Sequence, residues 1–141
     1  MKKSKESKTP MERSEVMRRV RSNNTSFEML LRRELWRRGL RGYRANDKSV
    51  FGKPDVVFKK RKIAIFIDSE FFHGKDYPNG RNIPTANREY WVKKIERNIE
   101  RDKEVTEHLQ ASGWTVIRIW SKDLKKNLTE WADSIENLIV N

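Results

Sequence analysis

Hydrophobic and polar positions alternate along this chain with two different periods, and these periods separate the expected helices from the expected strands. Over residues 25–40 the apolar side chains return at helical spacing, at Phe27, Leu30, Leu31, Leu35 and Trp36. We predict a helix there, ended by Gly39. Thr25 and Glu28 have the T-x-x-E spacing of a capping box, which gives Glu28 a structural role as an alternative to a functional one.

Two further helical patterns follow. Over residues 87–112 the apolar positions suit one buried stripe, formed by Trp91, Ile95, Ile99, Val105 and Leu109. Over residues 128–140 a second stripe is formed by Trp131, Ile135, Leu138 and Ile139. We predict a long helix over the first range and a closing amphipathic helix over the second. The prolines and glycine of residues 75–88 predict a loop before the long helix.

Strands are expected where β-branched and aromatic residues crowd together, over 55–58, 62–68 and 114–120, with a short strand over 43–46. Basic turns are expected between the first two runs and again over 122–126. The crossover from residue 68 through the long helix to residue 114 favours a mixed sheet with one parallel pair and helices on its faces. We therefore predict a three-layer α/β domain over residues 11–141.

The N-terminal segment has a different composition. Residues 1–10 have almost nothing to bury and predict a disordered basic tail. Residues 11–23 could form a short helix with Val16, Met17 and Val20 on one side. The other side carries the arginines Arg13, Arg18, Arg19 and Arg21. Such a short, charged helix is marginal alone, so it either docks on the domain or is ordered by DNA.

Charge points to the class of partner. The 141 residues carry a formal net charge of +12, and nucleic acid is the polyanion that a protein of this charge most often meets. A membrane surface is disfavoured, because the basic residues are spread along the chain and no apolar run approaches the roughly 20 residues that span a bilayer. Residues 1–8 lack the apolar core of a signal peptide. The chain has no cysteine, which excludes disulfides and thiolate zinc sites and is compatible with the cytoplasm.

Candidate chemistry lies at the ends of two expected strands. Asp55 opens the first apolar strand, Asp68 ends the second, and His73 follows five residues later. A buried carboxylate without a partner is costly, so these aspartates either lie on an exposed rim or gather around a cation. Phosphodiester hydrolysis uses Mg²⁺ held by such carboxylates, with a histidine as general base or acid. Glu28 could reach the same site from the first helix. Each aspartate alone would more often be a turn residue; their conjunction with His73 favours catalysis.

These residues also carry a family resemblance. The runs F-G-K-P-D-V-V-F and I-F-I-D-S-E-F-F-H-G resemble the core of the very-short-patch repair endonucleases, bacterial enzymes that nick DNA beside a T·G mismatch and belong to the restriction-endonuclease-like PD-(D/E)xK superfamily. R-S-E-V-M-R-R-V-R-S-N-N-T-S-F-E resembles the arm and first helix of that family. Y-W-V-K-K-I-E-R-N-I-E-R-D and G-W-T-V-I-R-I-W resemble its long helix and following strand. The likeness covers residues 13–120.

The resemblance implies a role for each matching residue. Asp55 would be the principal Mg²⁺ ligand, with Mn²⁺ as an alternative metal, aided by Asp68 and the backbone oxygen of Ile67. His73 would be the base for the attacking water, and Glu28 would support the metal through water. Asn98 and Asp102 match a polar pair near the active centre, and helix-surface polarity is their structural alternative. The catalytic set Glu28, Asp55, His73 and Asp102 also resembles that of a group of phage homing endonucleases.

DNA contacts follow from the same likeness. Met17, Phe71 and Phe72 match positions where the family wedges side chains into the base stack, with core packing as the alternative. Adjacent residues of an extended chain point to opposite sides, so at least one of the two phenylalanines should be free for DNA. Arg118 and the arginines of residues 13–21, among them Arg18, Arg19 and Arg21, are expected to contact phosphates.

The chain departs from the family at its structural zinc site. Glu70, Gly74, Lys75 and Asp76 fill that region, so we expect no zinc and a segment held by packing. Ile67 replaces a threonine whose backbone oxygen helps to hold metal, and Ser69 replaces a glycine. These differences bear on mismatch specificity more than on nuclease chemistry. They leave three roles open: repair, which acts on mismatched DNA, and homing or defence, which act on matched DNA.

Two functional classes follow from the sequence. The first is a Mg²⁺-dependent endonuclease that nicks or cuts duplex DNA in the cytoplasm of a bacterium or from a phage genome. The second is a non-catalytic DNA-binding module with the same fold, for which the positive charge alone would suffice. Asp55 and His73 divide the two, because only the enzyme needs them.

Overall fold

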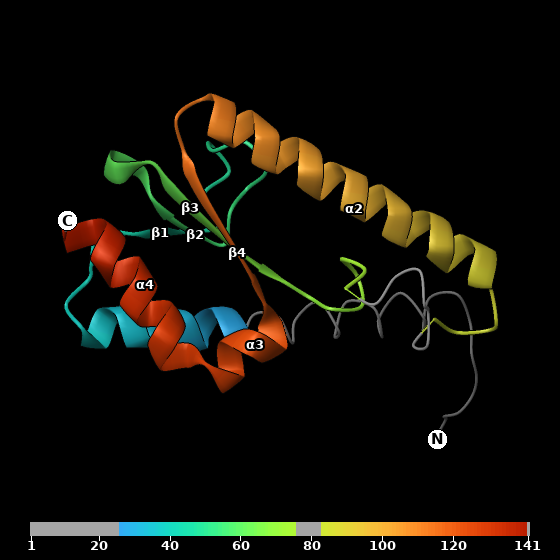
Figure 1. Cartoon of the computed structure of the whole chain (residues 1–141), viewed down its shortest axis with the longest axis horizontal. Coiled ribbons are helices and arrows are strands. Elements are labelled where there is room, and N and C mark those ends of the chain that lie inside the picture. The colour runs from blue at the N-terminus through green and yellow to red at the C-terminus, as the bar shows by residue number, and fades with distance from the viewer. Residues whose placement is uncertain (1–25, 76–82, 141) are drawn as a thin grey trace, which may run out of the picture.

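The fold is a mixed four-stranded sheet with helices on both faces (Figure 1). The structure, a computed structural model, describes residues 26–75 and 83–140. The predicted tail over residues 1–10 and arm over residues 11–23 lie outside the described residues, as do Thr25 and residues 76–82 of the predicted loop. In the described part of the chain, no helix is both long and apolar enough to cross a membrane.

The sheet has the predicted topology. Its strands are β1 (Arg44–Ala45), β2 (Val56–Phe58), β3 (Ile63–Asp68) and β4 (Thr115–Trp120), in the spatial order β1-β2-β3-β4. The first two pairings are antiparallel and β3 pairs with β4 in parallel. The basic turn between β2 and β3 is a short 3-10 helix, η2 (Lys59–Arg61), closed by Lys62 in the left-handed conformation at φ 55°. The three-layer α/β prediction is therefore confirmed.

The helices divide between the two faces of the sheet. A first helix over residues 26–37 lies beside α4 (Leu128–Val140) on one face, and α2 (Arg88–Ala111) crosses the other (Figure 1). The predicted basic turn at 122–126 is wrong, because residues there form the helix α3 (Ser121–Lys126). Its one fully buried apolar side chain, Leu124, gives no periodic signal in six residues.

Alternation along the strands builds two cores. Ile63, Ile65 and Ile67 of β3 pack with the first helix and α4, whereas Ala64 and Phe66 pack against α2. This is the period of two that a strand requires, and every residue of β3 is buried. The α2 core is closed by Val105 and Leu109.

Three apolar side chains leave the stripes on which the sequence placed them. Trp36 is 53% exposed and carries the Arg41 guanidinium 4.0 Å above its ring, and Leu138 is 42% exposed. Ile99 is 37% exposed, although it lies between the buried Ile95 and Val105 along α2. Stripe width depends on how far the sheet extends beneath each helix, which the helical period does not report.

A charge network joins the first helix to α4. Arg38, 13% exposed, reaches Glu34 at 2.7 Å, Asp133 at 2.6 Å and Glu136 at 3.0 Å. Hydrogen bonds from Arg37 and Arg38 lower the pKa of Glu34 to about 2. The ionised Glu34 therefore stabilises the fold above its ordinary pKa, and this contribution is lost as the pH falls towards 2.

We expect Arg38→Ala to lower the free energy of unfolding by about 1–3 kcal/mol at pH 7, because it removes a largely buried guanidinium whose charge-assisted hydrogen bonds join the first helix to α4. Arg37→Ala is the matched control: Arg37 binds the same Glu34 but is 70% exposed, and its loss should cost below about 1 kcal/mol. Urea denaturation of both variants measures the difference. Equal costs would show that the link to α4 contributes nothing.

Candidate active site

The strand period places the candidate aspartates on the α2 face of the sheet. Side chains two positions apart on a strand share a face. Asp55 therefore shares a face with Val57, and Asp68 shares one with Ala64 and Phe66, which all pack against α2. Arg118 of β4 pairs in register with Phe66 and lies on the same side. Side chains from three strands thus converge beneath one helix, as the sequence predicted for the two aspartates.

Asp55 is an uncompensated acid. Its Oδ2 accepts a hydrogen bond of 2.7 Å from the backbone N–H of Ile67, a residue of the neighbouring strand β3. Burial raises the pKa of Asp55 to about 7; the hydrogen bond opposes this, and the negative charges of Glu28 and Asp68 add to it. Within the described residues, no lysine or arginine is ion-paired with Asp55.

Glu28 is a second acid of this kind. Its side chain is buried, and among the described residues its Oε1 has no hydrogen-bond partner. Arg32 approaches no closer than 3.9 Å. Burial raises the pKa of Glu28, and Arg32 and a hydrogen bond with Asn46 offset only part of the increase. Thr25 lies outside the described residues, so the capping box stays a prediction.

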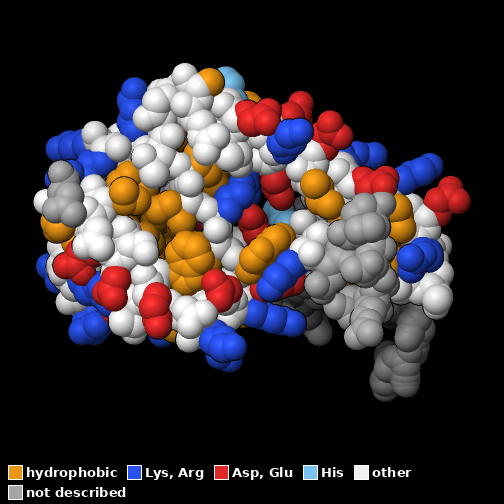
Figure 2. Space-filling view, viewed as in Figure 1, with side chains coloured by type: hydrophobic (Ala, Val, Ile, Leu, Met, Phe, Trp, Pro, Cys, Tyr) orange, Lys and Arg blue, Asp and Glu red, His pale blue; other side chains and the backbone are white. Residues whose placement is uncertain are grey.

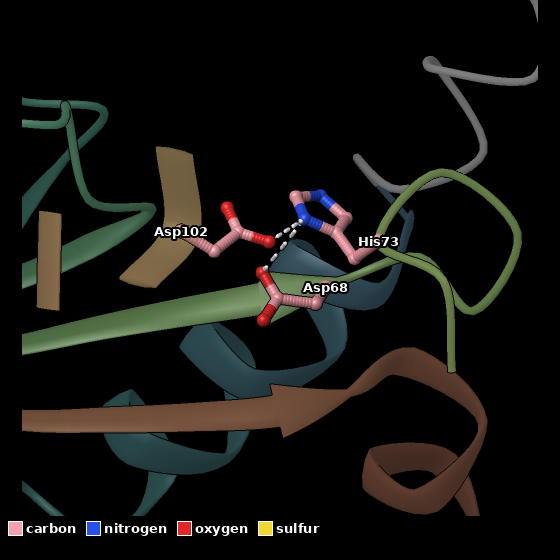
Figure 3. A group of neighbouring side chains, drawn as sticks. All are labelled: Asp68, His73 and Asp102. Atoms are coloured by element: carbon pink, nitrogen blue, oxygen red, sulfur yellow. Dashed lines mark hydrogen bonds and ion pairs between the residues drawn. The ribbon is translucent and has the colours of Figure 1, made fainter. Parts of the chain in front are cut away.

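His73 and Asp102 form a hydrogen-bonded pair. Nδ1 of His73, on the turn after β3, contacts Oδ2 of Asp102 on α2, and Oδ1 of Asp68 lies 3.8 Å from the same nitrogen (Figure 3). Burial opposes protonation of His73, but the hydrogen bond to Asp102 and the charge of Asp68 outweigh it and raise the pKa of the imidazole. The Asp102 carboxylate accepts a hydrogen bond from Nδ1–H, which leaves Nε2 as the basic nitrogen of the neutral ring.

Arg118 is a member of the site that the sequence did not place there. β4 is an edge strand, but the side chain of Arg118 is only 22% exposed and points inward. Nη1 lies 3.1 Å from both oxygens of Asp68, and Nε donates to Thr106 at 2.7 Å. The guanidinium also lies 4.1 Å above the Phe66 ring. Burial raises the pKa of Asp68, and the charges of His73 and Arg118 offset part of the increase.

These groups line one cavity of about 300 Å³ between the sheet and α2. Asp55, Asp68, His73 and Asp102 contribute acidic and basic groups to its wall, and Asn98 also lines it. Its cationic lining residues are Lys53, Lys94, Arg101 and Arg118. Figure 2 shows a hollow in the middle of one face, with acidic side chains and a histidine inside it and blue side chains nearby. Glu28 is not among the lining residues and acts on Asp55 through its charge.

The turn after β3 carries the two candidate wedge residues. It is a compact turn and not extended, so both phenylalanines can pack: Phe72 is buried at 9% exposure and Phe71 is half-buried. Their rings meet at 5.1 Å, and Phe71 stacks edge-on to Trp91 of α2 at 5.6 Å. Phe71 is the better placed of the two for DNA, and neither DNA role is more than a prediction. Met17, Arg18, Arg19 and Arg21 lie outside the described residues.

Asn98 holds this turn in place. Its Nδ2 donates a hydrogen bond of 2.9 Å to the backbone oxygen of Phe72. The helix-surface alternative for Asn98 is therefore wrong, and its predicted contact with DNA stays a prediction. The same α2 surface supplies Asp102, one helical turn further along.

The acidic groups fit a hard divalent cation. Asp68, His73 and Asp102 place one ligand atom each within 4.8 Å of one another, which is compact enough to hold a metal. Asp68 is engaged by Arg118, however, and would have to exchange that partner for a metal. Among the described residues no lysine or arginine is ion-paired with Asp55, and Arg32 offsets only part of the effect of burial on Glu28; carboxylate oxygens are the ligands that Mg²⁺, Ca²⁺ and Mn²⁺ prefer. The residues present therefore fit a metal beside Asp55.

The uncompensated Asp55 should make stability depend on pH. Its pKa is higher in the folded than in the unfolded chain, so in EDTA its contribution to stability falls as the pH rises from about 4 to about 7. We expect Asp55→Asn to raise the unfolding free energy at pH 8 in EDTA by about 1–4 kcal/mol, with little gain at pH 4. Urea melts at both pH values measure this, and an equal effect at both would contradict the charge explanation.

Comparisons with known proteins identify the family of this chain. A family model described as DNA mismatch endonuclease Vsr matches residues 5–79, more than half of the chain. The chain belongs to the Vsr family of DNA mismatch endonucleases. The resemblance drawn from the core motifs is thereby confirmed, and with it the predicted class, a DNA endonuclease.

Relatives of this Vsr-family chain match over most of their length. A type II nicking enzyme of Neisseria meningitidis serogroup C is 47% identical over 131 residues, covering 93% of this chain and 88% of the relative. A type II nicking enzyme of Haemophilus parainfluenzae is 45% identical, covering 93% of both chains. The DNA mismatch endonuclease Vsr of Escherichia coli K12 is 33% identical, covering 80% of this chain and 71% of the relative.

Proposed function

We propose that this chain is a Mg²⁺-dependent endonuclease that nicks one strand of duplex DNA beside a T·G mismatch. The observation that carries the proposal is the joining, in one basic-lined cavity, of a half-buried acid without an ion-paired lysine or arginine, Asp55, with the His73–Asp102 pair. The family model and the relatives named as nicking enzymes support the substrate class. A bacterial DNA substrate would place the reaction in the cytoplasm.

Four residues in or near the cavity bear on the metal. Asp55 would hold Mg²⁺, together with the backbone oxygen of Ile67, and Glu28 would act on it through water. Mg²⁺ would supply positive charge for the reacting phosphate. Asp68 joins the metal set only if it releases Arg118; otherwise it keeps the guanidinium in the cavity, where its charge faces the phosphate.

Proton transfer belongs to His73. Asp102 would accept a hydrogen bond from Nδ1–H, which fixes the ring and leaves Nε2 to take a proton from the attacking water. The attacking oxygen then forms a bond to phosphorus as the bond to the leaving 3′ oxygen breaks. Lys94 and Arg101 of α2 stand at the cavity and are suited to the flanking phosphates. Phe71 is suited to enter the base stack from the same side.

The substrate is tested with three labelled duplexes of one sequence that carry a T·G, an A·C or no mismatch, each in Mg²⁺, Mn²⁺ or EDTA. We expect a nick in one strand of the T·G duplex only, with Mg²⁺ or Mn²⁺. Cleavage of the matched duplex at an equal rate would replace repair with a homing or defence activity. Binding without cleavage under every condition would leave a DNA-binding module.

A further inference from the structure

The turn over residues 69–75 delivers His73 to the cavity, yet it lies outside the sheet. β3 ends at Asp68, and the turn closes on itself through hydrogen bonds from His73 N to Ser69 O at 3.0 Å and from Lys75 N to Glu70 O at 3.0 Å. Such bonds shape the turn but do not fix where it lies relative to Asp102. That position must come from contacts to other elements.

On the α2 side, the contacts are close. Gly74 has φ +67°, and a Cβ there would lie 2.6 Å from Cδ1 of Ile99 and 2.8 Å from Cγ2 of Ile95. Asn98 adds its hydrogen bond to the Phe72 oxygen. The turn is therefore pressed against α2, the helix that carries Asp102. Contact with one element still leaves the turn free to pivot about it.

On the opposite side, one carboxylate makes the connection. Glu70 Oε1 accepts a hydrogen bond of 2.7 Å from the Ser121 hydroxyl, and Oε2 accepts one of 2.9 Å from the Lys122 backbone N–H. Both donors begin α3, and Ser121 is buried at 4% exposure. β3 and β4 are parallel, with Asp68 opposite Trp120. The segments that follow the two strands therefore leave the sheet side by side. Glu70 joins these two segments just beyond the last residue pair of the strands, Asp68 and Trp120.

We propose that Glu70 is a positioning residue for the endonuclease reaction, which fixes the turn between α3 and α2 and so holds the His73 ring against Asp102. This inference rests on the proposed function for its catalytic consequence. Charge-assisted hydrogen bonds to both oxygens fix the carboxylate in direction as well as in distance. A second contact, Lys75 Nζ at 5.9 Å from the Trp120 ring, runs between the same two segments. The sequence predicts that packing holds this segment without zinc, and the two hydrogen bonds of Glu70 are a connection in addition to packing.

The test compares Glu70→Ala and Glu70→Gln with Glu130→Ala, an exposed carboxylate on α4 that gives the same change of charge. We expect Glu70→Ala to lower kcat for nicking by about 10–100-fold, because a small displacement of a catalytic group costs that much. KM for the duplex should stay within about twofold, since Glu70 does not line the cavity. Glu70→Gln keeps one acceptor and should recover part of kcat, whereas Glu130→Ala should behave as the wild type.

A second readout does not depend on cleavage. The chain has two histidines, so His108→Gln assigns the His73 ring resonances by elimination. At one fixed pH, the downfield Nδ1 proton signal of the His73–Asp102 hydrogen bond should be lost or broadened in Glu70→Ala and kept in Glu130→Ala. If the wild type does not nick DNA, the proposed function fails, and this signal alone decides on Glu70.

The outcomes separate clearly. Loss of kcat and of the His73 signal, with unchanged KM, supports the positioning role. A kcat within about twofold of wild type, or an intact His73 signal in Glu70→Ala, overturns it. Should Glu70→Ala fail to fold, two single variants replace it. Ser121→Ala removes the donor to Glu70 Oε1, and Glu70→Gln removes the charge. Each should give an intermediate loss of kcat.

Discussion

Asp55→Asn is expected to lower Mg²⁺-dependent nicking by at least about 10³-fold, because it removes the charge that would hold the metal beside the reacting phosphate, a contribution of several kcal/mol. DNA affinity in EDTA should not fall, since the change removes a negative charge from a cavity that meets phosphates. Asparagine keeps the shape of the side chain and can still accept the Ile67 N–H, so the fold should remain.

The measurement is single-turnover nicking of the T·G duplex, with affinity followed by fluorescence anisotropy in EDTA. Asp133→Asn is the matched control, because Asp133 is 57% exposed on α4 and lies in the Arg38 network on the other face of the sheet. It should nick at the wild-type rate. Nicking by Asp55→Asn within tenfold of wild type would remove Asp55 from the metal site and with it the proposed chemistry.

Disruption of the His73–Asp102 pair is expected to have the second largest effect. His73→Gln should lower kcat by about 10²–10⁴-fold, the usual contribution of a general base. Asp102→Asn should retain a base but lose its orientation, with a loss of about 10–100-fold. His108→Gln is the control, because His108 stacks on Phe51 at 4.2 Å and does not line the cavity that holds His73.

The dependence of kcat on pH should reveal the effect of Asp102 on the pKa of His73. A base must be unprotonated to act, so wild-type kcat should rise with pH through a raised His73 pKa. Asp102 and Asp68 raise that pKa against the effect of burial. Asp102→Asn should therefore move the acidic limb of the profile to lower pH while lowering its plateau. A limb that stays in place would indicate that His73 is not the group being titrated.

Much of the fold follows from periodicity, because burial repeats along each element. The closing helix has the predicted bounds, 128–140, and the long helix over Arg88–Ala111 differs by one residue at each end from its prediction. The hairpin and the parallel pair of β3 with β4 also follow from the order of elements. Six residues at α3 carry too few apolar positions for a period, and there the prediction was wrong.

Residue types at strand ends were enough to select Asp55, Asp68 and His73 from the sequence. Their arrangement was not. The sequence assigned Asp68 to metal, whereas the register of β3 against β4 brings it within 3.1 Å of Arg118, 50 positions away. Likewise, Glu70 contacts Ser121 only because the segments after the parallel strands β3 and β4 leave the sheet side by side.

The sequence by itself determined the fold class, the family and the identity of the acids and the histidine, since these depend on local spacing and residue chemistry. Only the tertiary structure decided which charge each acid meets: Asp102 pairs with His73, Asp68 pairs with Arg118, and among the described residues Asp55 has no lysine or arginine as an ion-pair partner. The reason is physical. Spacing along the chain reports which face a side chain takes, whereas its partner depends on strand register and on how each helix packs across the sheet.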